Sequence, residues 1–189
     1  MMKAKTNGIE INYEIEGSGP WLALSHSLCC DLHMWDEQMP ALTKQYKVLR
    51  FDTRGHGGSS APAGAYTLEQ MADDVRGLLD ALGIKQTHWC GLSMGGMIGQ
   101  VFALRHPGYF KTMVLADTTS YYPPEAQAPW GDRIKLAREK GMAPFGELMI
   151  ARWFTEGYVK RGAPALKRIA DSVRATPVDG FVEIGRAHV

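Results

Sequence analysis

Short apolar segments separated by polar loops recur along the first 116 residues of the chain. Residues 9–16 alternate between apolar and polar side chains, which is the period of a half-exposed strand, and the turn at 17–20 ends this segment as a hairpin-like opening. Residues 21–24 and 48–51 are almost wholly apolar runs, typical of strands that a parallel sheet buries. We expect two further strands, at 87–90 and 112–116.

Helical spacing appears between these strands. Residues 67–82 place apolar side chains three and four positions apart on one face, Thr67 and Gln70 fit a capping box, and Gly83 suits a helix end. Helices are also expected around 35–42 and over 94–105. Alternation of strand and helix predicts an α/β fold, a mostly parallel sheet with helices on both faces.

The pattern changes after Asp117. Candidate helices at 130–140, 147–155 and 164–174 follow one another with no strand among them, which is typical of a helical cap inserted over a site. We therefore expect a core at 1–118 and a cap segment at 119–182.

Charge and cysteine content narrow the possible partners. Lys and Arg number 21 against 20 Asp and Glu, and they are interspersed, so neither nucleic acid nor a membrane surface is an expected partner. The three cysteines favour reduced thiols over a disulfide framework, and the N-terminal residues lack a signal-peptide core. We expect a cytoplasmic protein that binds a small, largely apolar molecule.

The segment Gly91-Leu92-Ser93-Met94-Gly95 is the strongest chemical signal in the chain. Gly-x-Ser-x-Gly occurs often by chance, and the bland alternative is a glycine turn with an incidental serine. Here a strand leads in and a helix leads out, which is the context that exposes a nucleophilic serine on a sharp turn. Ser93 is therefore the predicted nucleophile.

A nucleophilic serine needs donors for the oxyanion that forms on attack. One comes from the residue after the serine and another from the loop after an earlier strand, which predicts the backbone N–H groups of Met94 and Leu28. The alternative for Leu28 is that it merely lines the pocket.

Three segments together resemble the α/β-hydrolase superfamily: residues 26–35, residues 52–57 and residues 91–96. Within it, residues 138–141 and 151–155 of the cap resemble the 3-oxoadipate enol-lactonases, over about residues 9–181. The resemblance implies hydrolysis of an enol-lactone in aromatic catabolism through the β-ketoadipate route. No pair of histidines and carboxylates has metal-ligand spacing, so we expect no metal, and we expect no cofactor. Such a substrate carries carboxylate, so Arg152 beside Trp153 is the candidate pair for binding it; an arginine on a cap helix is otherwise a solvated surface group.

The base and the acid of a serine triad are expected after the nucleophile, and they are not evident there. His106 closes the helix behind Ser93, His188 lies in a final segment that resembles translated sequencing adapter, and Asp117 is a minor candidate for the acid. His26 and His56 precede the serine and are interpreted as structural. We expect a C-terminally truncated fragment with a non-native tail at 183–189, little activity, and an exposed apolar edge at the strand over 112–116.

Two other functions stay open. One is a general esterase or a cofactor-free haloperoxidase-like enzyme on the same fold, which differs mainly in the cap. The other is a non-catalytic member that keeps the fold as a ligand pocket. A dehalogenase is disfavoured, because that branch needs a carboxylate where Ser93 stands.

Overall fold

A six-stranded sheet forms the base of the molecule in the computed structural model, which describes residues 2–121 and 123–186. The strand order is β1-β2-β4-β3-β5-β6, antiparallel at β1/β2 and β2/β4 and parallel elsewhere. The strands are β1 (Met2–Thr6), β2 (Ile9–Glu16), β3 (Trp21–Ser25), β4 (Lys47–Phe51), β5 (Thr87–Leu92) and β6 (Phe110–Ala116). The predicted mostly parallel sheet is confirmed.

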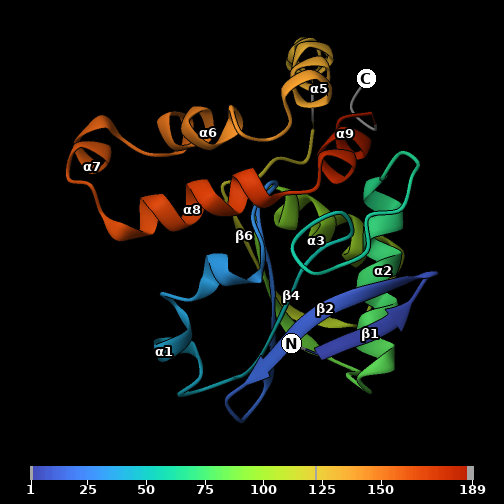
Figure 1. Cartoon of the computed structure of the whole chain (residues 1–189). Coiled ribbons are helices and arrows are strands. Elements are labelled where there is room, and N and C mark those ends of the chain that lie inside the picture. The colour runs from blue at the N-terminus through green and yellow to red at the C-terminus, as the bar shows by residue number, and fades with distance from the viewer. Residues whose placement is uncertain (1, 122, 187–189) are drawn as a thin grey trace.

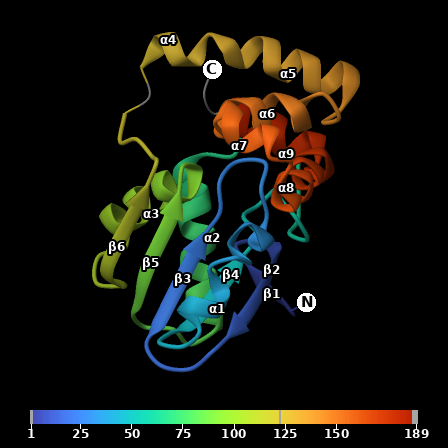
Figure 2. The same cartoon turned by 90° about the vertical axis from the view of Figure 1, so that its left-hand side faces the viewer.

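Helices cover both faces of this sheet. The long helices α2 (Leu68–Ala81) and α3 (Met94–Arg105) pack on one face, and the short 3-10 helix η1 (Leu32–Trp35) and helix α1 (Met39–Leu42) lie on the other. Figure 2 shows α1 in front of the strands and α2 and α3 behind them. Alternate residues of the central strands face opposite sides: Ala23 and Leu49 join the core under α2 and α3, whereas Leu22 and Val48 join the smaller one under Trp35.

The second layer of the chain is helical. Its members are α4 (Pro124–Gln127), α5 (Pro129–Lys140), α6 (Phe145–Trp153), α7 (Glu156–Lys160), α8 (Pro164–Ala175) and α9 (Val178–Arg186). They lie together over one end of the sheet (Figures 1 and 2), and Phe181 of α9 joins Trp130 and Phe145 in a cluster of their own. Within the described residues after Asp117 every regular element is a helix, as expected for a cap.

Helix α9 is where the cap meets the core. Gly180 packs so closely on Gly55 that a Cβ on either residue would overlap the other's backbone, and the Tyr66 N–H donates to the Glu183 carbonyl at 3.1 Å. Ile184 packs in the main core. Helix α9 runs across the expected boundary at residue 183, and residues 187–189, including His188, lie outside the described residues.

Three sequence expectations were wrong in detail. The hairpin forms between β1 and β2, across Asn7-Gly8, and not at the 17–20 turn. The strands on either side of that turn, β2 and β3, do not pair because β4 lies between them. The helix expected at 35–42 is split into η1 and α1. Helices α4, α7 and α9 and strand β1 were not anticipated. None of the described helices is both long and apolar enough to cross a membrane.

Candidate active site

Ser93 stands alone between β5 and α3, with φ 52° and ψ −112°. A positive φ is costly for a residue with a Cβ, about 1–3 kcal/mol, so the surroundings must hold it. The Ser93 N–H donates to the Ala116 carbonyl at 2.9 Å, and the Ser93 carbonyl accepts the Gly96 N–H at 2.9 Å. Thr118 donates its hydroxyl to the same carbonyl at 2.7 Å. These bonds fix the sharp turn that the motif predicts.

The glycines around Ser93 are required by close backbone approach. A Cβ on Gly91 would overlap the backbone of Gly95, and a Cβ on Gly95 would overlap the backbone carbonyl of Ser25 in β3. A Cβ on Gly96 would overlap the side chain of Thr118. The start of α3 can therefore seat against β3 only if these positions lack side chains, as the spacing of the motif indicates.

The loop after β3 carries Leu28 and is held by buried histidines. Cys29 has φ 61°, and its N–H donates to His56 Nε2 at 3.1 Å. The Thr53 N–H donates to His26 Nε2 at 2.9 Å. Burial lowers the pKa of His26, and burial together with the neighbouring His26 ring lowers the pKa of His56 to about 3. Both rings are therefore neutral acceptors at ordinary pH, which agrees with the structural role expected of them.

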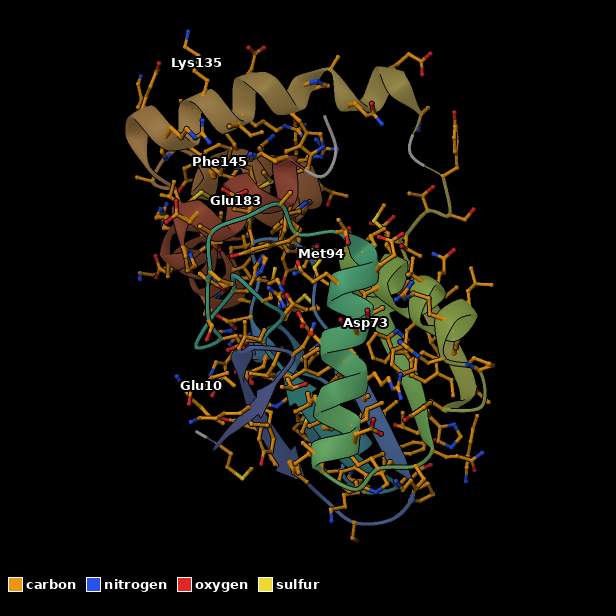
Figure 3. The ribbon with its side chains drawn as sticks, turned by 90° about the vertical axis from the view of Figure 1, so that its right-hand side faces the viewer. Glu10, Asp73, Met94, Lys135, Phe145 and Glu183 are labelled. Carbon is orange, nitrogen blue, oxygen red and sulfur yellow. The ribbon has the colours of Figure 1, made fainter. Side chains whose placement is uncertain are left out.

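Two cavities meet at Ser93. One of about 330 Å³ reaches from Leu28 and Met94 to the cap helices α5 and α6, and another of about 580 Å³ reaches Cys30 and Phe154. Five residues line both: Ser27, Ser93, Asp117, Arg152 and Trp153. In Figure 3, Met94 lies where the core faces the cap, whereas Lys135 points outward from α5. The structure thus brings every predicted site residue to one place.

The predicted oxyanion donors are the backbone N–H groups of Leu28 and Met94. Met94 is the first residue of α3, and the first N–H groups of a helix have no intrahelical acceptor. Among the described residues, neither the Leu28 N–H nor the Met94 N–H is used in a backbone hydrogen bond. Both residues line the cavity that contains Ser93.

The histidines of the described residues lie elsewhere, and none of them lines either cavity. His106 sits at the far end of α3, where its Nε2 contacts Asp73 at 2.8 Å. Asp117 does line both cavities, at the end of β6 with φ 41°. In the described part of the chain, no group of three or more His, Cys, Asp or Glu side chains could hold a metal ion.

Among the lining residues that were not anticipated, Thr118 and Arg133 matter most for the site. Thr118 follows the end of β6, and a signal was available, because carboxyl ends of neighbouring parallel strands share one edge of the sheet. Arg133 on α5 lines the cavity with Arg152. Its sequence signal is weak: no acidic residue stands three or four positions away on the helix, so it lacks the usual surface partner.

Comparison with known proteins gives consistent matches. The profile of the family described as alpha/beta hydrolase fold matches residues 20–158. The "3-oxoadipate enol-lactonase 2" of Acinetobacter baylyi is 37% identical over 175 residues, which are 92% of this chain and 65% of that protein. The crystal structure of the enol-lactonase from Burkholderia xenovorans is 41% identical with a TM-score of 0.92, covering 98% of this chain and 72% of that one.

A further solved structure is an esterase. The thermophilic esterase from Thermogutta terrifontis, with malate bound, is 29% identical with a TM-score of 0.91, over 98% of this chain and 71% of that one. The chain thus spans about two thirds of the length of these relatives. The strand–serine–helix turn, the sheet and the helical layer above it agree with these matches, and the chain belongs to the α/β-hydrolase family.

Proposed function

We propose that this chain carries the nucleophile, the oxyanion donors and the cap of a serine hydrolase of carboxylic esters or lactones, similar to the 3-oxoadipate enol-lactonases. The observation that carries the proposal is Ser93 itself: a serine held at positive φ, opening into a cavity that Leu28 and Met94 also line. Relatives named enol-lactonase, at 37% and 41% identity, support the choice of a lactone.

The reaction follows from the geometry of the turn. The Ser93 oxygen attacks the acyl carbon, its proton passes to a base, and the carbonyl oxygen becomes an oxyanion that the Leu28 and Met94 N–H groups bind. Each such donor contributes about 3–4 kcal/mol to transition-state stabilisation in serine hydrolases. The alkoxide or enolate of the ring then leaves, and water releases the acid from the acyl-serine. We propose that the base lies outside the described residues, because no described histidine lines the cavities.

The substrate's carboxylate would bind Arg152, with Trp153 against the ring. Arg152 lines both cavities at Ser93, and its exposed guanidinium has no acidic partner within the described residues.

We also propose the organisation that this function needs: a core at 1–118, a cap at 119–182 and a tail at 183–189 that is not native. Reading the gene past the codon for Glu183 tests the tail. Native coding sequence that reproduces residues 184–189 would contradict it.

The substrate is tested with the chain completed at its C-terminus by the remaining third of the Acinetobacter baylyi enol-lactonase. Hydrolysis of 3-oxoadipate enol-lactone and of 4-nitrophenyl acetate is compared by kcat/KM. The lactone should be preferred. A strong preference for the aryl ester would contradict the lactonase assignment and favour a general esterase, and loss of both activities in a folded protein would favour a non-catalytic binding role.

A further inference from the structure

Three cap side chains separate the cavity at Ser93 from a second cavity on the outside of the cap. The outer cavity, of about 270 Å³, lies between α5 and α6 and is lined by Leu136, Phe145 and Leu148 among others. Arg133, Met149 and Arg152 line both the outer cavity and the inner one of about 330 Å³. These three side chains therefore form the partition between the two cavities.

The two arginines in this partition form no ion pair with any residue that the structure describes. Two other arginines of the cap are paired, Arg174 with Glu147 at 2.6 Å and Arg168 with Glu37 at 3.1 Å, whereas Arg138 and Arg161 have no ion-pair partner among the described residues but line none of these cavities. Among the described residues, neither Arg133 nor Arg152 has an acidic group within ion-pair distance. Unpaired guanidinium groups beside a cavity are available to an anionic ligand.

The charges facing the partition leave it positive on both sides. Asp132 lines the outer cavity and Asp117 lines the inner one, so each cavity meets two guanidinium groups and one carboxylate. The Arg133 guanidinium lies 5.4 Å from the centre of the buried Trp130 ring, and this contact helps to hold it in place. A cavity with an excess of one charge sign concentrates ligands of the opposite sign.

Met149 gives the partition its capacity to open. It precedes Arg152 by three positions on α6, so both side chains lie on the same face of that helix. A methionine side chain is unbranched and changes rotamer at small cost. Met149 packs in the apolar cluster of the cap, and a change of its rotamer is the movement that joining the two cavities requires.

We propose that Arg133, Met149 and Arg152 form a positively charged entrance through the cap, by which small esters and lactones bearing a carboxylate reach Ser93. Arg133 attracts the carboxylate at the outer cavity and Arg152 receives it beside the serine. The proposal rests on the proposed function and adds to it the route of entry and the role of Arg133.

The test measures association of two ligands that differ by one charge. Monomethyl adipate and dimethyl adipate are mixed with the 189-residue chain in a stopped-flow instrument, and binding is followed by tryptophan fluorescence and checked by calorimetry. In Arg133→Gln, the association rate constant of the monomethyl ester should fall about five- to tenfold at low salt, with less than about a twofold change for the dimethyl ester. The difference should nearly vanish at about 1 M salt, where charges are screened within about 3 Å.

Arg138→Gln is the matched control, because Arg138 is an exposed arginine of the same helix and is absent from the lining of these cavities. It should leave both rates unchanged. Three outcomes would each overturn the entrance. They are equal slowing in the two variants, unchanged rates in Arg133→Gln, and failure of the wild-type chain to bind the charged ester faster than the uncharged one. These binding results do not depend on turnover, so they are separable from failure of the hydrolase proposal, which Ser93-dependent activity decides.

Discussion

The conformation of Ser93 depends on neighbouring glycines, which have no side chain. Gly91 and Gly95 allow backbones to approach where any side chain would overlap a carbonyl group, and Thr118 completes the arrangement with one hydroxyl. A serine at φ 52° is thus maintained by the packing of α3 on β3 rather than by its own preference. Residues that never touch a substrate therefore decide whether the nucleophile is presented.

Gly95→Ala tests this packing. Because the added Cβ meets the backbone of Ser25, which cannot rotate away, the free energy of unfolding should fall by about 1–3 kcal/mol in urea denaturation. Gly131→Ala is the matched control: a methyl group added there on α5 would meet no described residue outside its own helix within 4 Å, so stability should hold or rise by about 0.5–1 kcal/mol. Equal stability of both variants would contradict the close approach.

The buried histidines make stability depend on pH. The pKa of His56 is about 3 in the folded chain against 6.5 in an unfolded one, so between these values only the unfolded state takes up the proton. The sign follows directly: stability is complete above pH 6.5 and falls as pH decreases toward 3. Each such histidine contributes a slope of up to about 1.4 kcal/mol per pH unit.

His56→Gln should reduce the slope of the unfolding free energy against pH by up to about 1.4 kcal/mol per pH unit, the contribution of one titrating histidine. Denaturation at a series of pH values measures this slope. His33→Gln, which removes an exposed histidine outside the network, is the control for loss of an imidazole. A slope that His56→Gln leaves unchanged would show that His56 does not titrate with folding.

At the scale of elements, β6 is the feature with the clearest consequence. It is the last strand of the sheet in the described chain, and Val114 and Leu115 are 56% and 43% exposed on its two faces. The sequence predicts an exposed apolar edge here, and the structure confirms it. Such an edge offers unpaired backbone groups to another chain.

Val114→Lys should therefore reduce self-association, because a charged residue on an edge strand opposes strand pairing between molecules. Light scattering during concentration of the chain measures the effect. Leu104→Lys is matched to it, since Leu104 is 84% exposed on helix α3 and offers no strand backbone for pairing. If both variants improve solubility equally, general hydrophobicity rather than the edge governs association.

The elements that the sequence predicts well are those with a local signal. Helix α3 begins and ends as expected, at Met94 and Arg105, and Thr67 caps α2 by accepting the Gln70 N–H at 3.1 Å. The short pieces η1, α1 and α7 are missed or merged because four or five residues carry too little periodicity. The hairpin was misplaced because pairing of β2 with β4 is a long-range choice that no local turn reveals.

The whole molecule explains why part of the site could not be predicted. Leu28, Met94 and Ser93 follow strand ends, so their meeting follows from parallel topology. Arg133 reaches the cavity because α5 packs on α9, and α9 packs on the core through Gly180. Helices α5 and α9 are about 40 residues apart in the chain, and the residue pattern of neither helix indicates that it packs on the other.

Across the whole molecule, the described residues present a nucleophile with oxyanion donors and a cap, and the base is proposed to come from elsewhere. The direct test of that account is ester hydrolysis by the 189-residue chain, by the C-terminally completed chain, and by the completed chain with Ser93→Ala. The account predicts turnover near background for the first, catalysis by the second, and loss of about a millionfold in kcat for the third. Fast turnover by the 189-residue chain, or turnover in the completed chain that survives Ser93→Ala, would contradict it.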